Sequence, residues 1–483
     1  MPLSAPSSRA PSLATLIALA GLTACGGLAS EQDASSSTTA QSLSHGHPAP
    51  NGEQLFDQAF ADTNGRSCST CHVLDEHTVL TPAHVSALLA ENPLDPLFNR
   101  IDADDPLAVE PSYEHLKKGL VRVVLALPEN MDLLDLEGNV VTGPERTVEV
   151  WRGVPTVENT AITAPYQYDG RHATLQEQAQ GAISSHSQGG QVRRKDLDAI
   201  ARFQEEQFSS NRARKVAKQL ARGVPVEEIE RPELSLKNLT PAQARGLEVY
   251  NLACEACHGG ATTTQVTNRE VHDLAFVQLR PDGNVLFDSS VQPPKAVLLP
   301  RPDNEFLNIG LANLSALGQL GLFPLFNASV ALPRYRYRFY TDGSRTTQVV
   351  DLPPVPVTAS NTGSPFDLFF PALDENGAPI LGPNFLPQLF STDPGRAAIT
   401  GQPEDFEAFD VPPLRGIKNS APYFHDNSAE TLRDLVNIYS QFIVQFFPPL
   451  NLPLINPPET EGGPPESLSP AQKQDLIEFL NLL

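Results

Sequence analysis

Apolar side chains recur at helical spacing in two segments, one near the middle and one at the end of the chain. In KDLDAIARFQEEQF (195–208) the apolar face consists of Leu197, Ile200, Ala201 and Phe203. In SPAQKQDLIEFLNLL (469–483) it consists of Leu476, Ile477, Leu480 and Leu483. A spacing of three or four residues places such side chains on one face of a helix, and a Ser-Pro start is typical of a helix N-terminus. We therefore predict one amphipathic helix at the end of each half of the chain.

Two further helices are predicted ahead of these. Thr240 can cap a helix whose first residue is Pro241 and which continues through AQARGLEVYNLA. The segment NGEQLFDQAF (51–60) occupies the corresponding place in the first half. By contrast, GLVRVVLALP (119–128) and RTVEVWRGVP (146–155) alternate well enough to predict strands. Taken together, these segments predict a mainly α fold with a few short β-strands.

The composition is that of a globular and acidic protein. Of the 483 residues, 40% are hydrophobic and 19% are charged, which is typical of a chain with a buried core. The formal net charge of −23 disfavours a nucleic-acid partner and favours a small basic partner, such as a redox carrier. The 45 proline residues predict long extended loops.

The N-terminus has the features of an export signal. The apolar run LATLIALAGLTA (13–24) is too short to span a bilayer, and small residues precede Cys25. We interpret residues 1–25 as a lipoprotein signal peptide that ends at a lipidated Cys25, and residues 26–50 as a flexible tether. The alternative is an ordinary secreted protein in which this cysteine is incidental. The expected location is the periplasm, with the lipid anchor as the only membrane contact.

The remaining four cysteines form two copies of one motif. Cys68, Cys71 and His72 lie in CSTCH, and Cys254, Cys257 and His258 lie in CEACH. In C-x-x-C-H, two thiols bond covalently to one haem and the adjacent histidine binds its iron. A zinc site would usually bring the cysteine pairs closer in sequence, and a redox disulfide would not need a histidine after each pair. The motifs therefore predict two covalently attached c-type haems, with His72 and His258 as proximal iron ligands.

A second repeat follows the cysteine motifs. The segment VPTVENTAITAPYQYDGRHATLQEQ (154–178) aligns without a gap to VPPLRGIKNSAPYFHDNSAETLRDL (411–435), with an offset of 257 residues from Val154 to Val411. A gap-free match at corresponding places after two haem motifs indicates a duplicated domain.

The two repeats divide the chain into two halves. We expect a first haem domain over 51–210, a charged linker over 211–238 and a second haem domain over 239–483. The second domain is the longer one because it contains a proline-rich insert over 275–405.

These motifs resemble those of the di-haem bacterial cytochrome c peroxidases and their MauG-like relatives. The resemblance rests on both haem motifs, on VPTVENTAITAPYQYDGRHATLQEQAQGAI, and on DPGRAAITGQPEDFEAFDVPPLRGIKNSAPYFHD with the following ETLRDLVNIY. It covers nearly all of the mature chain. The long insert and residues 73–150 are similar to the larger RoxA-like members. The resemblance implies two tandem cytochrome c-like domains with long proline-rich loops.

The resemblance also implies a division of labour between the two haems. The haem of the first domain meets hydrogen peroxide or dioxygen. The haem of the second domain takes electrons from a small carrier, a cytochrome c or a cupredoxin, and relays them. The tryptophan between the haems in this family falls at Tyr168, which could still relay electrons. The asparagine that binds calcium in the family falls at Gly153, which calls a calcium ion into question.

The distal side of the first haem departs from the peroxidase pattern. The family's distal glutamate falls at Gln188, which can form hydrogen bonds but cannot act as an acid or a base. His186, two residues earlier, is the candidate for general acid–base chemistry at neutral pH. It could equally bind the first iron as a sixth ligand or point into solvent.

The distal side of the second haem departs as well. The family's methionine ligand falls at Tyr439, and the chain contains no other methionine than Met1 and Met131. A phenolate prefers ferric iron, so ligation by Tyr439 would lower the reduction potential. The alternative is that Tyr439 only packs on the inner face of its helix.

We expect the chain to be an exported di-haem oxidoreductase that is similar to cytochrome c peroxidase. It would reduce hydrogen peroxide at the first haem with electrons relayed through the second. One alternative is a MauG- or RoxA-like oxidase or oxygenase that acts on an organic substrate. Another is a cytochrome that only transfers electrons.

Overall fold

A computed structural model describes the chain in several ranges. They are residues 50–267 except 136 and 237, then 287–288, 290, 295–296, 306–309, 331–353, 390–443 and 466–483. The predicted signal peptide, nearly all of the predicted tether and much of the 275–405 insert lie outside the described residues. In the described part, none of the helices has the length and apolar character needed to cross a membrane.

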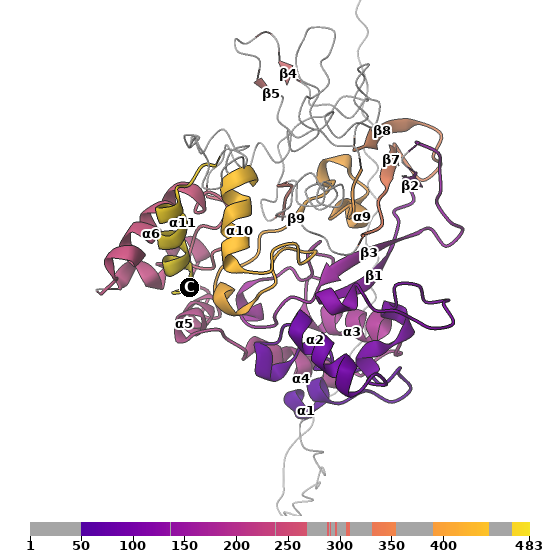
Figure 1. The fold of residues 1–483 in the computed structure, drawn as a ribbon, viewed down its shortest axis with the longest axis horizontal. Coiled ribbons are helices and arrows are strands. Elements are labelled where there is room, and N and C mark those ends of the chain that lie inside the picture. The colour runs from indigo at the N-terminus through magenta and orange to yellow at the C-terminus, as the bar shows by residue number, and fades with distance from the viewer. Residues whose placement is uncertain are drawn as a thin grey trace, which may run out of the picture. The chain divides into compact units, whose positions relative to one another are not determined.

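The described chain is mostly helical and has a few short strands, as the sequence predicts (Figure 1). The helices are α1 (Gly52–Asp57), α2 (Pro82–Glu91), α3 (Leu175–His186), α4 (Arg194–Glu205), α5 (Asn211–Leu220), α6 (Pro241–Ala253), α9 (Ala397–Thr400), α10 (Leu432–Ile438) and α11 (Pro470–Leu480). The longer strands are β1 (Leu120–Ala126), β2 (Met131–Leu134), β3 (Thr147–Gly153), β7 (Arg336–Tyr340) and β8 (Gln348–Leu352). Two-residue strands are β4 (Phe287–Asp288), β5 (Lys295–Ala296), β6 (Phe306–Leu307) and β9 (Phe409–Asp410).

The predicted helices form where their local signals place them. Both α6 and α11 begin with proline and with a capping box, in which Thr240 pairs with Gln243 and Ser469 pairs with Gln472. These boxes satisfy backbone N–H groups that a helix start otherwise leaves unpaired. In α4, the apolar face that the sequence predicts is buried at Leu197 and Ile200.

The helix that leads to each cysteine motif packs on the closing helix of the same half. Helix α1 contacts α4, and α6 contacts α11 (Figure 1). A glycine lies at each crossing. A Cβ at Gly52 would lie 2.2 Å from the carbonyl oxygen of Ala199, and one at Gly246 would lie 1.9 Å from that of Asp475. Both crossings are therefore closer than any side chain at these positions would permit.

The two segments predicted as strands form an antiparallel hairpin. Strands β1 and β3 pair from Leu120 opposite Gly153 to Ala126 opposite Thr147. A second sheet has the order β2–β7–β8, so that a strand of the first half pairs with strands from the insert. The side chains of Tyr337, Phe339 and Phe406 form part of the core of this sheet.

The two copies of the sequence repeat have the same local structure. A short 3₁₀ turn occurs at Thr160–Ile162 and again at Ile417–Asn419. Antiparallel bridges follow at equivalent places, and α3 and α10 then begin with equivalent capping boxes. The backbone φ is positive at Gln167 (74°) and at its equivalent Phe424 (69°). The sequence repeat is therefore a repeat in structure.

The segment predicted as a charged linker is ordered and partly buried. It contains α5, whose apolar side packs on Ile162 and Ile229. Its Glu233 is fully buried and forms an ion pair with Arg415, with an Nη1–Oε1 distance of 2.8 Å. This contact attaches the segment to the second copy of the repeat.

The crossing of α6 and α11 gives a stability prediction. Replacing Gly246 with alanine inserts a Cβ against the backbone of Asp475, so we expect a loss of about 1–3 kcal/mol in the free energy of unfolding. Urea unfolding measures the change. Gly143→Ala is the control, because a Cβ at Gly143 meets no atom within 4 Å. Equal stability of the two variants would contradict the tight crossing.

Candidate functional site

The two motif histidines are held in the same way. Nδ1 of His72 donates to the carbonyl oxygen of Thr78 at 3.1 Å, and Nδ1 of His258 donates to that of Pro412 at 3.2 Å. The donor role follows because a carbonyl oxygen only accepts, and it leaves Nε2 as the nitrogen that can bind a metal. Burial lowers the pKa of both imidazoles to about 4. Both rings are therefore neutral near pH 7, as an iron ligand must be.

In each half, a threonine that follows the motif histidine in sequence joins the cysteine motif to the repeat. Thr78 and Thr263 both have a positive φ, of 59° and 62°. The hydroxyl oxygen of Thr78 accepts from the N–H of Val157 at 2.9 Å, and that of Thr263 accepts from the N–H of Leu414 at 2.8 Å. Val157 and Leu414 are equivalent positions of the repeat. Sequence reasoning missed these threonines, although each follows its motif histidine by five or six residues.

The four motif cysteines are unpaired and surrounded by apolar side chains. Burial raises the thiol pKa to about 12 for Cys68, about 11 for Cys71 and about 12 for Cys254 and Cys257. Among the described residues, no three His, Cys, Asp or Glu side chains gather into a metal cluster. Each motif thus offers apolar surroundings, two neighbouring free thiols and an available Nε2, and these features fit one haem at each motif.

The two copies of the repeat meet between the motifs. The N–H of Gly153 donates to the carbonyl oxygen of His425 at 2.7 Å, and that of Asp410 donates to the carbonyl oxygen of Tyr168 at 2.8 Å. Gly153 is equivalent to Asp410, and Tyr168 is equivalent to His425, so the two bonds are related by the repeat. A Cβ at Gly153 would lie 2.2 Å from Oδ1 of Asn427. In this arrangement, position 153 has no room for a side chain that could bind calcium.

A buried network of ion pairs lies beside Tyr168. The guanidinium of Arg152 contacts Asp169 at 2.6 Å and both carboxylate oxygens of Asp393 at 2.7 and 2.9 Å. Arg171 also contacts Asp169, at 2.6 Å. Burial alone would raise the pKa of Asp169, but Arg152 and Arg171 outweigh it and hold this pKa below its ordinary value. The network ties the first copy of the repeat to the segment that precedes the second.

The predicted distal residues lie at the end of α3. His186 is the last residue of this helix, and burial lowers its pKa. His186 contributes electrostatically to the lowered pKa of His72, so the two imidazoles lie near each other. Gln188 is exposed and has a positive φ of 54°. Asn64 donates to the carbonyl oxygen of His186 at 2.9 Å and to Oε1 of Gln188 at 3.4 Å.

Arg66, two residues before the CSTCH motif, also contacts this region. It is 2% exposed, and its guanidinium contacts Asp102 at 2.6 Å and the carbonyl oxygen of Pro96 at 2.9 Å. A longer contact of 3.5 Å reaches the carbonyl oxygen of His186. Sequence reasoning missed both Arg66 and Asn64, because their partners lie far away in the chain. The available signal was the position of both residues just before CSTCH.

Tyr439 is placed next to the second cysteine motif. It is the first residue of a π-helical turn, Tyr439–Ile443, that follows α10. Its ring is half-buried and stacks on Phe424, with ring centroids 6.1 Å apart. Burial raises the pKa of Tyr439, and Cys257 and Cys254 raise it further. Such π turns often occur at functional sites, but nothing in the sequence indicates one here.

The other histidines between the first motif and the repeat bind carboxylates. They are His77 with Glu158 at 3.1 Å, His84 with Glu76 at 2.9 Å and His115 with Asp104 at 2.6 Å. Trp151 is 4% exposed and stacks on His115, with ring centroids 4.0 Å apart. These contacts account for the three histidines and Trp151 as structural residues.

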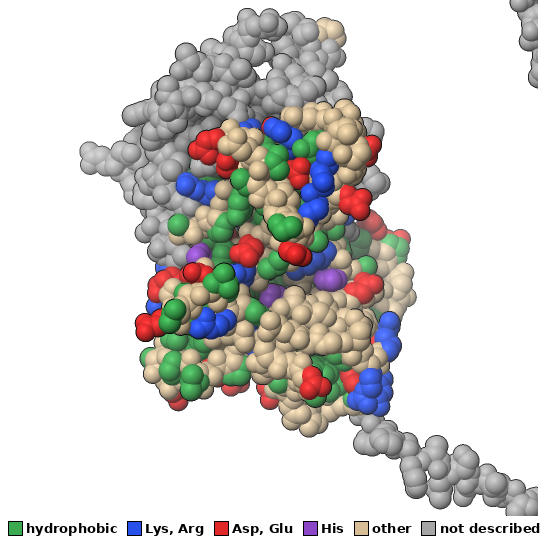
Figure 2. Space-filling view, turned by 90° about the vertical axis from the view of Figure 1, so that its right-hand side faces the viewer, with side chains coloured by type: hydrophobic (Ala, Val, Ile, Leu, Met, Phe, Trp, Pro, Cys, Tyr) green, Lys and Arg blue, Asp and Glu red, His purple; other side chains and the backbone are tan. Residues whose placement is uncertain are grey.

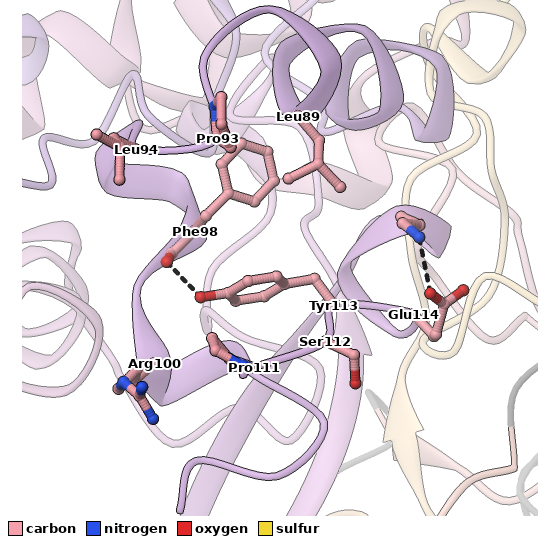
Figure 3. A pocket seen from close by; sticks show the side chains of 10 residues that line it. Leu89, Pro93, Leu94, Phe98, Arg100, Pro111, Ser112, Tyr113 and Glu114 are labelled. Atoms are coloured by element: carbon pink, nitrogen blue, oxygen red, sulfur yellow. Dashed lines mark hydrogen bonds and ion pairs between the residues drawn. The ribbon is translucent and has the colours of Figure 1, made fainter. Parts of the chain in front are cut away.

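A surface pocket lies apart from these residues. It has a volume of about 600 Å³ and is lined in part by Leu89, Phe98 and Tyr113 (Figure 3). The hydroxyl of Tyr113 donates to the carbonyl oxygen of Phe98 at 2.5 Å. None of the sequence-predicted site residues lines this pocket. On the face shown in Figure 2, acidic and basic side chains are interspersed.

The two histidine sites share one construction, and each lies beside a C-x-x-C pair that fits one haem. Residues 51–242 match the model of the family described as di-haem cytochrome c peroxidase. The match confirms, over residues 51–242, the resemblance found in the motifs. The second motif lies beyond the matched segment.

Comparison with solved structures finds distant similarity over most of the chain. A MauG-like protein associated with microbial copper homeostasis is 15% identical, with 90% of this chain and 89% of that chain covered and a TM-score of 0.33. The di-haem peroxidase BthA of Burkholderia thailandensis is 14% identical, with 89% and 84% covered and a TM-score of 0.33. Hydrazine synthase of Kuenenia stuttgartiensis is 15% identical, with 80% and 85% covered and a TM-score of 0.31. The search of curated proteins gave no match.

The ion-pair network gives a prediction of pH dependence. Because the pKa of Asp169 is depressed in the folded protein, its stabilisation is present above the unfolded value of about 3.9 and is lost as the pH falls through the folded value. We expect Asp169→Asn to lose about 3–5 kcal/mol at pH 7. The difference from the unmodified protein should shrink as the pH falls toward 3.

Urea unfolding across this pH range measures the difference. Asp342→Asn is the control, because Asp342 is exposed and its pKa is lowered by local bonds to Ser344. A deficit of Asp169→Asn that stays constant with pH would contradict the role given to the ion pairs.

Proposed function

We propose that this protein is an exported di-haem c-type oxidoreductase similar to cytochrome c peroxidase. It reduces hydrogen peroxide at the first site, with electrons from a small redox carrier relayed through the second. The observation that carries the proposal is the shared construction of the two sites. Each site holds a neutral histidine by Nδ1 beside a C-x-x-C pair, and the two sites are joined through one repeat contact.

The residues that would hold the haems are those of the two motifs. Cys68 and Cys71 would bond to one haem and Cys254 and Cys257 to the other, with Nε2 of His72 and of His258 bound to iron. When bound, the haems supply the one-electron chemistry that the protein side chains lack. The chain itself fixes the ligand rings, places apolar side chains around the thiols and provides the groups around the distal side.

The distal groups of the first site have distinct roles in this proposal. His186 is the candidate that holds or delivers a proton at its imidazole, because burial keeps the ring neutral and able to accept one. Gln188 can only donate or accept hydrogen bonds. Asn64 positions both residues through the end of α3.

The second candidate function is a MauG- or RoxA-like oxidase or oxygenase that acts on an organic substrate. Two observations favour it. Position 188 has no acid, and Tyr439 lies against the second cysteine pair in place of a methionine. Tyrosine is an established protein ligand for haem iron. A third candidate, a cytochrome that only transfers electrons, requires His186 to be a fixed ligand of the first iron.

We also propose a periplasmic location with a lipid anchor at Cys25. The apolar run 13–24 and the small residues before this cysteine support it. An exported chain would reach the compartment in which c-type haem is attached, and its acidic charge suits a basic carrier.

One experiment separates the candidate functions. The ferric full-length protein is examined by optical and EPR spectroscopy, before and after addition of hydrogen peroxide. A spectral change that reduced carrier reverses supports the peroxidase function. A changed state that persists without a carrier supports the oxidase or oxygenase. Two low-spin haems that do not respond to peroxide would contradict every catalytic proposal.

The missing distal acid gives a prediction for activity. Gln188→Glu supplies a carboxyl group at the family's position, so we expect peroxide turnover to rise at least about tenfold. Steady-state oxidation of reduced carrier measures the rate. Gln54→Glu is the control, since it adds the same charge at an exposed position on α1. An unchanged rate in Gln188→Glu would show that position 188 does not face the reacting oxygen.

Tyr439 gives a spectroscopic prediction. If its phenolate oxygen binds the second iron, Tyr439→Phe removes the ligand and changes the ferric EPR and absorption spectra of that haem. Tyr423→Phe is the matched control, because the hydroxyl of Tyr423 donates to the carbonyl oxygen of Ile417 at 2.8 Å. Identical spectra for Tyr439→Phe and the unmodified protein would leave Tyr439 with only a packing role.

A further inference from the structure

Helix α5 has cations along its exposed face. The exposed side chains that form this α5 stripe are Arg214, Lys215, Lys218 and, just beyond the end of the helix, Arg222. A helix turns by about 100° per residue, so these positions all lie within an arc of about 100°. The buried side chains of Val216 and Ala217 lie on the other side of the helix, where they pack in an apolar cluster. The stripe is therefore a surface feature that the core does not use.

The α5 stripe has no acidic counter-charge. No Asp or Glu occurs between Glu206 and Glu227, although the whole chain has 57 acidic and 34 basic residues. Within the part of the chain that the structure describes, none of the stripe's side chains forms an ion pair. By contrast, Arg194 at the start of α4 pairs with Asp198 at 3.0 Å. The positive charge of the stripe is thus left for a partner outside the described fold.

The stripe is unfavourable for the helix that carries it. Lys218 lies four residues from both Arg214 and Arg222, and like charges at this spacing repel each other on a helix. Arg214 also lies near the helix N-terminus, where the helix dipole disfavours a cation, and α5 has no acidic residue in its first turn. An anionic partner that binds along the stripe would relieve this repulsion.

The proposed lipid anchor indicates which anionic partner lies within reach. Residues 26–50, the predicted tether after Cys25, would have an average reach of about 25–30 Å. The described chain begins at residue 50 and leads into α1, which contacts α4. Helix α4 has 12 residues and so is about 18 Å long, and α5 begins shortly after it, at Asn211. The stripe would therefore remain close to the surface that holds the anchor.

The surface of a bilayer that contains anionic phospholipids is complementary to the stripe. Each lysine or arginine next to such a surface gains roughly a fivefold factor in affinity. At physiological ionic strength, charges more than about 8 Å away are largely screened. The charge of the contacting face therefore matters more than the net charge of −23 of the whole chain. Because the anchor already holds the protein at the membrane, a second contact needs little affinity of its own.

We propose that the α5 stripe docks this protein on the anionic headgroups of the membrane that carries its lipid anchor. The contact is electrostatic and lies at the headgroup level, since the apolar side of α5 is buried in the protein and cannot insert. That apolar side packs in a cluster with Ala261, shortly after His258 of the second haem motif. Docking would thus place the second motif on the membrane side of the protein. The proposal rests on the proposed lipid-anchored location.

An acidic redox carrier is the alternative partner for the same cations. A free carrier of this kind has to approach through the field of a strongly acidic chain. The anchored protein, by contrast, is held beside the headgroups without any such approach. The membrane is therefore the partner that the observations favour, and the carrier is one outcome of the test.

The test uses the full-length holoprotein with Cys25→Ser, which removes the lipid so that the charge contact is measured alone. Its affinity is measured by sedimentation with two kinds of vesicle at about 0.1 M salt. One kind is phosphatidylcholine alone, and the other contains about 30% phosphatidylglycerol as the anionic lipid. The ratio of the two affinities cancels any contribution of the N-terminal segment that does not depend on lipid charge.

Two double variants with the same net charge are compared. Lys215→Gln with Lys218→Gln removes two cations of the stripe and keeps residues that favour a helix. Lys195→Gln with Lys418→Gln is the matched control, because both lysines are exposed and neither belongs to the stripe. All four positions are on the surface, so we expect both variants to fold as the unmodified chain does.

We expect the unmodified protein to bind the anionic vesicles at least about tenfold more tightly than the neutral ones. This ratio should fall at least about tenfold in the stripe variant and stay unchanged in the control. It should also decrease as the salt concentration rises, because the contact is electrostatic.

Three outcomes overturn the proposal. The first is equal affinity of the unmodified protein for the two kinds of vesicle. The second is an equal loss of affinity in the stripe variant and the control, which would assign the effect to net charge. The third is unchanged vesicle binding of the stripe variant together with slower oxidation of an acidic redox carrier, which would assign the stripe to that carrier.

Failure of this proposal is distinguishable from failure of the proposed function and location. Vesicle binding is measured without peroxide and does not depend on the reaction of either haem. An intact mass of the exported protein that shows no lipid on Cys25 contradicts the anchor. The vesicle measurement uses a chain without that lipid, so its result concerns the stripe alone.

Discussion

Two exchanged backbone hydrogen bonds, from Gly153 to His425 and from Asp410 to Tyr168, hold the two copies of the repeat against each other. Each copy also reaches back to its own haem motif, because Val157 and Leu414 donate to the threonines that lie beside the motif histidines. The position of one motif relative to the other is therefore set by a chain of short contacts through backbone groups and two threonine hydroxyls. Side chains can vary where this chain uses only peptide groups, but not at Thr78, Thr263 or Gly153.

The two copies have the same backbone structure but differ in how their buried charged groups are paired. In the first copy Asp169 is neutralised by Arg152 and Arg171, and Asp393 completes the network. In the second copy the equivalent Asp426 has an unsatisfied carboxylate oxygen among the described residues, beside the unsatisfied imidazole of His425. Fixed charge pairs make the first side electrostatically rigid, and among the described residues the second side has no such ion pair at Asp426. The duplication thus supplies symmetric positioning, and the substitutions within it change how the buried charges are paired.

The sequence predicted the parts that depend on local spacing. Helix periodicity, capping residues and the strand alternation around β1 and β3 are local, and the structure confirms them. The cysteine motifs and the repeat could also be found in the sequence, because each consists of consecutive residues. The residues that hold the site were not. Asn64 and Arg66 contact His186 from more than a hundred positions away, and Asp393, near the end of the insert, contacts Arg152 across 241 positions. Such contacts depend on the path of the whole chain, and no local pattern marks them. The predicted roles of the site residues themselves remain predictions.

The supply of protons is the constraint that separates the candidate functions. Cleavage of a peroxide bond at the first site consumes protons, and position 188 offers an amide where a carboxyl group would deliver them. His186 can partly replace the carboxyl group, but its burial lowers its pKa and so leaves it unprotonated for most of the time near pH 7. We therefore expect such a site to turn over peroxide slowly and to hold its oxidising equivalents for longer, because proton delivery limits the cleavage step.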